Sequence, residues 1–324
     1  MALISLDDLR AAQKRIAGVA VRTPLLPCPW AETEHRTLHL KPEMLQPTGA
    51  FKIRGAYNRL AALTPEERAR GVVAQSSGNH AQAVAYAARA LGIKAVIVMP
   101  DTSPAVKVEN TRSFGAEVIL VRMHERDDVP GELAAEHGYV WVPPYDDPWI
   151  IAGQGTVGLE IAEDATALDL DLRTVLVPVS GGGLISGTAA ALKLTMPGVR
   201  VVGVEPELAG DAAESFRTGE RAVWPFELTH RTIADGLRTN TLGLLPWEHV
   251  QAYVDDIITV TEAEIRSTVA VLARRGRLVA EPSGAVATAA YLHHADRLPQ
   301  GRSVAAVVSG GNLDPALLSE LLSQ

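Results

Sequence analysis

Short apolar runs rich in valine alternate with stretches of helical pattern along most of the chain. The apolar runs lie at residues 38–40, 72–74, 95–99, 118–121, 140–142, 174–179, 201–204 and 304–308. The helical stretches lie at residues 55–63, 81–91, 104–114, 131–136, 156–165, 184–194 and 262–275, and Ser5 and Asp8 predict a capped helix that ends near Ile16. Continuous apolar strands that alternate with helices are typical of parallel sheets covered on both faces.

This alternation predicts the α/β class, with two open, mostly parallel twisted sheets flanked by helices. A closed barrel of alternating strands and helices is the competing architecture, but it would give a more even period than this chain has. We expect a large domain formed by residues 1–47 together with 146–324, and a small domain formed by residues 48–145. Because ligands of open parallel sheets bind at the carboxyl ends of the strands, the cleft between the domains is the expected site.

Composition narrows the classes of partner. The 324 residues carry a formal net charge of −8, which disfavours nucleic acid and anionic membranes. Residues 1–10 contain acids and no long apolar stretch, so we expect no signal peptide, and no run approaches the length of a membrane span. The single cysteine, Cys28, excludes an internal disulfide and favours a reducing compartment. The sequence therefore predicts a cytoplasmic protein that acts on small molecules.

Lys52 is the first candidate for chemistry, because it stands at the start of a predicted helix directly after the turn at residues 47–50. A helix N-terminus favours anions, and the apolar neighbours Phe51 and Ile53 also disfavour a charged ammonium group. A neutral lysine amine is a nucleophile that forms Schiff bases with aldehydes. The alternative is an exposed lysine at a helix start.

Three predicted strands end in turns that combine glycine with small hydroxyl or amide side chains, at residues 75–80, 180–184 and 309–314. The turn at 180–184 reads Ser-Gly-Gly-Gly-Leu, so its backbone N–H groups can converge on an anion beside a helix N-terminus. Three consecutive glycines cost much conformational entropy for a turn without a ligand, which is the alternative. The lysine of a Walker loop does not follow.

Residues 153–158 read Gly-Gln-Gly-Thr-Val-Gly and match the dinucleotide-binding pattern. The following strand ends in Ser180 and glycines instead of the acid that would bind a ribose, and Pro148 makes the preceding segment a poor strand. We interpret this segment as the glycine-rich start of a packed helix. An oxidoreductase that binds NAD(P) remains the alternative from a different class.

Five segments, taken in order, resemble one enzyme family over nearly the whole chain. They are Thr-Gly-Ala-Phe-Lys-Ile-Arg-Gly-Ala at 48–56, Ser-Ser-Gly-Asn-His-Ala-Gln at 76–82, Ala-Gly-Gln-Gly-Thr at 152–156, the glycines at 181–183, and Ser-Gly-Gly-Asn at 309–312. Together they resemble the pyridoxal-phosphate enzymes of the tryptophan-synthase-β fold, also called fold type II. The sequence at 76–80 is similar to the threonine dehydratase and serine racemase branch, because cysteine-synthase relatives usually carry Thr-Ser-Gly-Asn-Thr there.

The resemblance implies pyridoxal 5′-phosphate in the cleft between a large cofactor-binding domain and a small substrate-side domain. Lys52 would form the Schiff base and then act as the base at the substrate Cα. Phe51 would pack on the cofactor ring, Asn79 would bind the ring hydroxyl oxygen, and Ser309 would face the pyridine nitrogen. The phosphate would be held by the backbone of Gly181, Gly182, Gly183 and Leu184.

The substrate carboxylate would be bound by Ser76, Ser77, Asn79 and His80 at a helix start, where anions are favoured. In serine racemases, the serine aligned with Ser77 is the acid or base opposite the lysine, so the resemblance keeps racemisation open. A helix cap is the alternative role for Ser77.

A metal site is also implied. Glu205, the Ala209 carbonyl and Asp211 would bind Mg²⁺ or Ca²⁺ as they do in the racemase branch, since oxygen ligands suit hard cations. A solvated acidic turn is the alternative.

Two arginines stand at positions that bear on the substrate. Arg238 occupies a stretch that lines the pocket in relatives and could bind a second substrate carboxylate, although a surface location is the alternative. Arg126 could align with a substrate arginine of racemases, but the loop length differs. After residue 312 the chain leaves no room for the regulatory domain of isoleucine-inhibited threonine dehydratases, so we expect no such control.

These features predict an ammonia-lyase (dehydratase) that converts a 2-amino-3-hydroxy acid such as threonine or serine to a 2-oxo acid and ammonia. The alternatives are a 3-hydroxyaspartate dehydratase and a serine racemase with side dehydratase activity. We expect a homodimer by the same resemblance.

Overall fold

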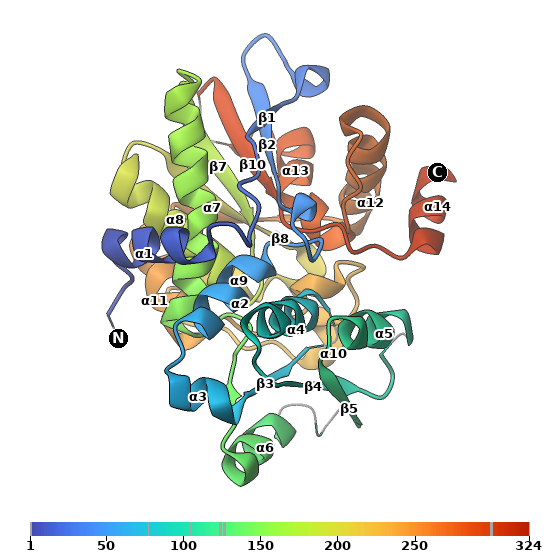
Figure 1. The fold of residues 1–324 in the computed structure, drawn as a ribbon. Coiled ribbons are helices and arrows are strands. Elements are labelled where there is room, and N and C mark those ends of the chain that lie inside the picture. Colours follow the sequence, from blue (N-terminus) through green and yellow to red (C-terminus); the bar gives the residue numbers. More distant parts are fainter. Residues whose placement is uncertain are drawn as a thin grey trace.

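A computed structural model describes residues 2–76, 78–103, 105–122, 125, 128–298 and 301–323. The fold contains two separate sheets, each flanked by helices (Figure 1). The larger sheet has the order β1 (Leu26–Pro27), β2 (Thr37–Pro42), β10 (Ser303–Val308), β7 (Leu172–Pro178), β8 (Arg200–Pro206) and β9 (Asp256–Val260). The smaller sheet has the order β5 (Glu117–Val121), β4 (Ala95–Pro100), β3 (Val72–Gln75) and β6 (Val140–Trp141).

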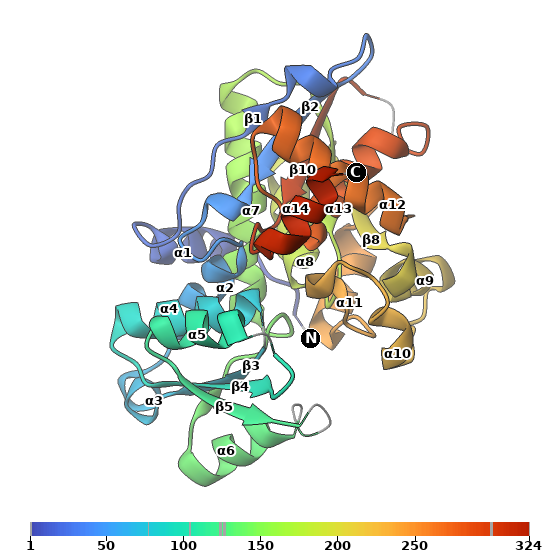
Figure 2. The same ribbon diagram turned by 90° about the vertical axis from the view of Figure 1, so that its right-hand side faces the viewer.

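All strand pairs are parallel except the short β1, which is antiparallel to β2. The prediction of two open, mostly parallel sheets is therefore confirmed, and the closed barrel is wrong. The strand β9 was missed, because its five residues follow a half-polar segment without a clear apolar run. The smaller sheet comes entirely from residues 72–141, between β2 and β7 of the larger one, and Figure 2 shows it below the larger body.

The helices are placed as follows. In the first half they are α1 (Leu6–Ile16), α2 (Lys52–Ala61), α3 (Pro65–Arg70), α4 (Asn79–Leu91), α5 (Ala105–Ser113), α6 (Val129–His137) and α7 (Pro148–Ala167). In the second half they are α8 (Gly183–Thr195), α9 (Asp211–Thr218), α10 (Phe226–Thr229), α11 (Leu244–Tyr253), α12 (Glu262–Val271), α13 (Pro282–His293) and α14 (Pro315–Ser323). The predicted N-cap at Ser5 is confirmed at the start of α1, where Ser5 and Asp8 form a capping box.

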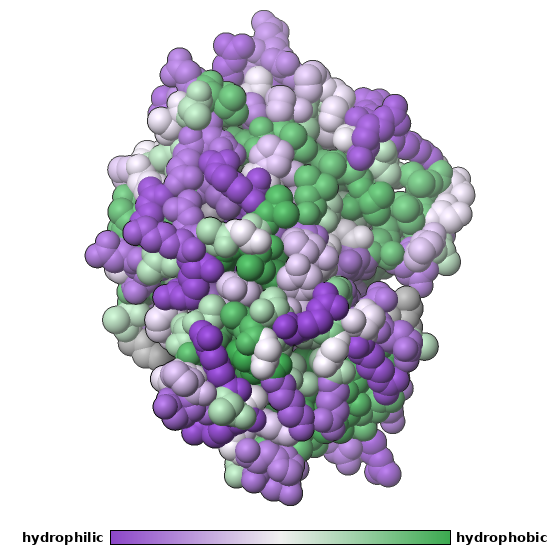
Figure 3. All heavy atoms as spheres, viewed as in Figure 1, coloured by the Kyte–Doolittle hydropathy of each residue, from purple (hydrophilic) through white to green (hydrophobic). Residues whose placement is uncertain are grey.

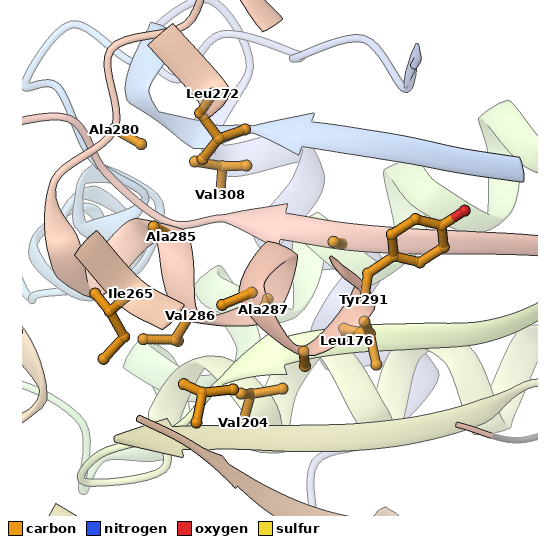
Figure 4. Packing of buried hydrophobic residues seen from close by; sticks show 14 of the residues in the cluster. Leu176, Val204, Ile265, Leu272, Ala280, Ala285, Val286, Ala287, Tyr291 and Val308 are labelled. Atoms are coloured by element: carbon orange, nitrogen blue, oxygen red, sulfur yellow. The ribbon is translucent and has the colours of Figure 1, made fainter. Parts of the chain in front are cut away.

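The two faces of the larger sheet carry different helices. Side chains alternate along a strand, so neighbouring residues of β7 face opposite layers. Val175 and Val177 join the cluster that includes residues of α7 and α8, whereas Leu176 belongs to the cluster with α12 and α13. Figure 4 shows Leu176 in that second cluster, together with Val286 and Tyr291 of α13. Both faces are buried, as the unalternated valine-rich strands predicted.

The glycine pattern at 153–158 lies inside α7, not at its start, which corrects the predicted boundary. Pro148 occupies the first turn of α7, where its missing N–H costs nothing, and the Asp147 side chain accepts from the backbone N–H groups of residues 149 and 150. A Cβ on Gly155 would collide with the backbone of Gly187 in α8. The segment therefore serves close packing of two helices, and a packed helix is what the sequence predicted.

A buried ionic network anchors the helix that begins with Lys52. Arg54, in the first turn of α2, is fully buried and donates to both carboxylate oxygens of Glu43 and of Glu160 at 2.7–2.8 Å. Lys41 of β2 donates to Glu160 over 2.6 Å. Two cations and two carboxylates balance one another, which a buried set of charges requires. The network ties α2 to α7 and to the end of β2.

No helix in the ranges described above has both the length and the apolar character needed to cross a membrane.

Candidate active site

Lys52 opens α2 as predicted, and its side chain is partly buried beside Phe51. Its Nζ donates to the backbone carbonyl of Pro144 over 2.8 Å and lies 5.2 Å from the Phe51 ring centroid. Burial lowers the pKa of Lys52 from 10.5 to about 8. The amine is thus partly neutral near physiological pH, in the state required of a nucleophile or base.

The loop before Lys52 is pinned to the end of β10. Phe51 N–H donates to the Ser309 carbonyl over 3.0 Å, and Ala50 forms a bridge with Gly310. The Ser309 side chain is buried, and its Oγ makes a long 3.5 Å contact with the Ser283 carbonyl. Predicted residues from distant parts of the chain, Phe51, Lys52 and Ser309, are therefore brought together.

His80 lies close to Lys52 and is neutral. Its Nε2 is 3.0 Å from the Val142 carbonyl, which can only accept, so the ring proton is on Nε2. Burial, and secondarily the Lys52 charge, lower the pKa of His80 to about 3. The imidazole therefore cannot pair with a carboxylate as a cation, and a substrate role for His80 would fall to its backbone N–H.

The first turn of α4 lies in this region, because it contains His80. Ser76 Oγ accepts from Gly78 N–H over 3.1 Å, and α4 begins at Asn79. Among the described residues, the N–H groups of Asn79 and His80 have no protein acceptor. They are available to an anion, which the start of a helix stabilises. Ser77, predicted to be catalytic, lies outside the described residues.

Asn79 belongs to a chain of three polar side chains. Its Nδ2 donates to Glu281 Oε1 over 2.7 Å, and its Oδ1 accepts from Asn312 Nδ2 over 2.7 Å. Glu281 is 4% exposed, and burial is the main reason that its pKa is raised to about 8. Sequence reasoning missed Glu281, although it directly precedes Pro282 at the start of a helix.

The glycine turn lies between β7 and α8, at the carboxyl end of its strand. Gly182 has a φ of 93°, which a residue with a side chain rarely adopts, and residues 181–184 are buried. Within the described ranges, the N–H groups of these four residues have no protein acceptor. Buried donors without a partner are costly, so an anion with several oxygens fits here. Tyr145 packs against Gly181 and Gly183, so packing also requires these glycines.

The predicted metal residues lie at the end of β8 and the start of α9. Glu205 Oε2 accepts from Ala213 N–H over 2.8 Å, but its Oε1 and both oxygens of Asp211 are buried without a hydrogen-bond partner among the described residues. Burial, together with the Asp211 charge, raises the pKa of Glu205, and burial raises the pKa of Asp211 to about 7. These oxygens fit a hard cation, which would compensate them.

Two carboxylates do not complete a ligand set. The described residues contain no cluster of three or more His, Cys, Asp or Glu side chains suited to a metal ion. A backbone carbonyl such as that of Ala209 would have to contribute, and the metal site stays a prediction.

Arg238 is only partly available for a substrate. Its Nε and Nη2 both donate to the Thr232 carbonyl, at 3.0 Å and 2.6 Å. Binding of a second carboxylate by Arg238 stays a prediction. Arg126 lies outside the described residues.

The donor set as a whole fits pyridoxal 5′-phosphate. An amine with a lowered pKa suits its aldehyde, four neighbouring backbone donors without an acceptor among the described residues suit its phosphate, and Asn79 and Ser309 offer polar groups to its ring. The roles of the individual residues stay predictions.

Comparison with known proteins agrees with this geometry. Residues 16–310 match the family model described as pyridoxal-phosphate dependent enzyme. The chain is 43% identical to the L-threonine ammonia-lyase of Thermotoga maritima, over 99% of this chain and 79% of the relative. It is 41% identical to the catabolic L-threonine dehydratase of Escherichia coli K12 (98% and 96% covered) and 40% identical to the L-threo-3-hydroxyaspartate ammonia-lyase of Saccharomyces cerevisiae (98% and 95%).

Solved structures give the same result. A threonine deaminase from the organism abbreviated T.th. superposes with a TM-score of 0.90 at 44% identity, covering 96% of this chain and 99% of that one. Maize serine racemase superposes with a TM-score of 0.92 at 38% identity, covering 99% and 98%. The predicted resemblance is confirmed, and the chain belongs to the family of pyridoxal-phosphate-dependent enzymes.

Proposed function

We propose that the protein is an ammonia-lyase that converts a 2-amino-3-hydroxy acid of the threonine or serine type into a 2-oxo acid and ammonia. The single observation that carries the proposal is the place of the Lys52 amine, at the first residue of α2 and held by the Pro144 carbonyl over 2.8 Å, where burial lowers its pKa to about 8 and leaves it able to accept a proton. The full-length relatives named threonine ammonia-lyase and threonine dehydratase support the reaction and the substrate class.

In this proposal the N-terminus of α4 binds the substrate and Lys52 transfers the proton. The N–H groups of Asn79 and His80, which have no acceptor among the described residues, bind the substrate carboxylate and so fix the Cα near Lys52. The neutral amine then removes the Cα proton, and the β-hydroxyl leaves as water after gaining a proton. Hydrolysis of the resulting enamine releases ammonia and the 2-oxo acid, so the water lost is regained.

Bound pyridoxal phosphate would supply the electron-withdrawing ring that stabilises negative charge at Cα. Ser309 is a neutral side chain at the position proposed for the pyridine nitrogen, so it would leave that nitrogen largely unprotonated. A moderate electron sink suits loss of a β-hydroxyl, because a long-lived carbanion is not needed.

The proposal is tested with purified protein and Lys52→Ala. Wild type should take up pyridoxal 5′-phosphate, turn yellow, and release 2-oxo acid and ammonia in equal amounts from L-threonine or L-serine. Lys52→Ala should lose both the colour and at least about 10³-fold in rate. A wild-type protein that takes up no cofactor, or that takes it up and releases no 2-oxo acid from any hydroxy amino acid, would refute the proposal.

A second candidate substrate is 3-hydroxyaspartate, because the yeast relative at 40% identity carries that activity in its name. Serine racemisation is a third candidate activity, supported by the maize structure. A panel of L-threonine, L-serine, D-serine and the 3-hydroxyaspartate isomers, with chiral analysis of residual serine, separates the three. Arg238→Leu should lower the kcat/KM for 3-hydroxyaspartate alone if Arg238 binds the second carboxylate.

We also infer the division into a cofactor-binding domain (1–47 and 146–324) and a substrate-side domain (48–145), a homodimeric state and a cytoplasmic location. Apolar residues gather on part of the surface seen in Figure 3, at its upper right. Leu45 and Val279 are about half exposed, at 49% and 47%, and are the kind of side chain that an interface buries. Analytical ultracentrifugation of wild type and Leu45→Glu tests the dimer, since a monomeric wild type would contradict it.

A further inference from the structure

We propose that Glu281 is a positioning residue of the site, which holds the Asn79 side-chain amide in the orientation that leaves one N–H for the cofactor. The inference rests on the proposed function, because Asn79 is the residue expected to bind the ring hydroxyl oxygen. No role was predicted for Glu281 from the sequence, and its carboxyl takes no part in the proton transfers described above.

Hydrogen bonds connect Glu281, Asn79 and Asn312 in series, and the series ends at the Thr48 carbonyl. This carbonyl fixes the orientation of the Asn79 amide. The Thr48 carbonyl can only accept, so the Asn312 atom 2.9 Å from it is Nδ2. The same Nδ2 lies 2.7 Å from Asn79, so the Asn79 atom that faces it is Oδ1. The Asn79 Nδ2 therefore lies on the opposite side, 2.7 Å from Glu281 Oε1. This assignment does not depend on the protonation of Glu281.

The hydrogen bonds leave Asn79 with a defined remaining capacity. Its Nδ2 carries two hydrogens, of which Glu281 accepts one. Its Oδ1 accepts from Asn312. The second Nδ2 hydrogen is left for a further ligand, and a donor is the polarity that a ring hydroxyl oxygen bearing negative charge requires.

Glu281 is held firmly enough to act as a support. It is the N-cap residue of α13, and its backbone N–H donates to the Gly310 carbonyl over 3.1 Å. A Cβ at position 310 would collide with Glu281 Oε1, so only glycine leaves room for the carboxyl there. The carboxyl thus lies against Gly310, the residue that follows Ser309, as well as against Asn79.

The charge of Glu281 suits this location. Burial and the Asp235 carboxylate raise its pKa to about 8, whereas the Asn79 hydrogen bond and the Lys107 ammonium act in the opposite direction. Lys107 also forms a 2.7 Å ion pair with Asp235, so these two charges largely offset each other. Near pH 7 the carboxyl is mostly protonated, and it can accept from Asn79 without setting a negative charge beside the ring oxygen.

A double-mutant cycle on cofactor affinity tests the inference. The Kd for pyridoxal 5′-phosphate is measured by absorbance titration for wild type, Glu281→Leu, Asn79→Ala and the double variant. Glu281→Leu should weaken binding about 5- to 10-fold, because one hydrogen bond that orients Asn79 is lost. The double variant should bind as Asn79→Ala does, since Glu281 acts through Asn79. Additive effects, or an unchanged Kd in Glu281→Leu, would overturn the inference.

Glu281→Gln is the conservative substitution in this test. It also allows the test to be made if Glu281→Leu fails to fold. The glutamine keeps a carbonyl oxygen for Asn79 and stays neutral, so its Kd at pH 7 should lie within about 3-fold of wild type. Between pH 7 and 9 the wild type should lose affinity relative to this variant, because Glu281 ionises beside the ring. A constant ratio of the two Kd values across that range would contradict the inference.

Glu264→Gln is the matched control, because Glu264 is a partly buried glutamate whose side chain contacts Thr261 and His294 and no candidate site residue. Its cofactor affinity should equal that of wild type at every pH. If wild type itself binds no pyridoxal phosphate, the proposed function fails. If wild type binds it and Glu281→Leu binds it equally well, only the role of Glu281 fails.

Discussion

Lys52 Nζ donates a hydrogen bond to the carbonyl oxygen of Pro144 over 2.8 Å, and burial is the cause of its lowered pKa. A backbone carbonyl orients the amine without adding the full negative charge that would hold it protonated. The amine is therefore placed and partly neutral before any cofactor binds.

The reaction of Lys52 with aldehydes should follow this pKa. With a pKa of about 8, about a tenth of the amine is neutral at pH 7, whereas an ordinary lysine is neutral in well under a thousandth of molecules. The rate of cofactor attachment to the apoprotein should rise with pH and level off above about pH 8, as measured by stopped-flow absorbance. Borohydride trapping and peptide mapping should place the label on Lys52. A rate that still rises steeply at pH values well above this pKa would contradict the lowered pKa.

Removing the buried guanidinium should destabilise the protein strongly. Arg54→Leu leaves the carboxylates of Glu43 and Glu160 buried with their principal partner gone, so we expect a loss of about 3–5 kcal/mol in the free energy of unfolding. Chemical denaturation measures this loss, and the m-value should stay unchanged. Arg22→Gln is the control, because Arg22 is half exposed in its ion pair with Asp164 and should cost at most about 1 kcal/mol.

The phosphate should contribute much of the cofactor affinity. Pyridoxal, which has the same aldehyde and ring but no phosphate, should bind at least about 100-fold more weakly, because it leaves the buried amides of residues 181–184 without a partner. Inorganic phosphate should compete with pyridoxal 5′-phosphate but not with pyridoxal. Equal affinities of the two aldehydes, measured by absorbance titration, would argue that the glycines serve packing against Tyr145 alone.

The melting temperature should depend both on the acidic pair Glu205 and Asp211 and on divalent cations. Asp211→Asn removes a buried carboxyl group that has no hydrogen-bond partner among the described residues and lies near Glu205, so without divalent ions the variant should melt at a higher temperature than wild type. Millimolar Mg²⁺ or Ca²⁺ should raise the melting temperature of wild type and leave the variant nearly unchanged. Glu207→Gln, a substitution in the adjoining turn, should respond to cations as wild type does. A wild type that is insensitive to both cations would remove the metal site from consideration.

Local pattern predicted the sheets and the turns but not the polar contacts between distant segments. Valine-rich strands and glycines at their carboxyl ends are readable from neighbouring residues, and both sheets were found. The hydrogen bond between Asn79 and Glu281 joins residues 202 positions apart, and no periodic pattern in the sequence predicts it. The neutrality of His80 likewise depends on the Val142 carbonyl, which folding brings to it. The start of α7 was misplaced because Pro148 breaks a strand yet begins a helix well.

The insertion of the smaller sheet between β2 and β7 separates two kinds of evolutionary change. The glycine turn, Ser309 and Glu281 all follow residue 171 and belong to the larger sheet or to segments beside it, whereas α4 is built with the smaller sheet. Substitutions in the inserted part change the surroundings of α4 and leave the glycine turn between β7 and α8 as it is. Such modularity would let one scaffold give rise to enzymes with different substrates, each still retaining the same cofactor.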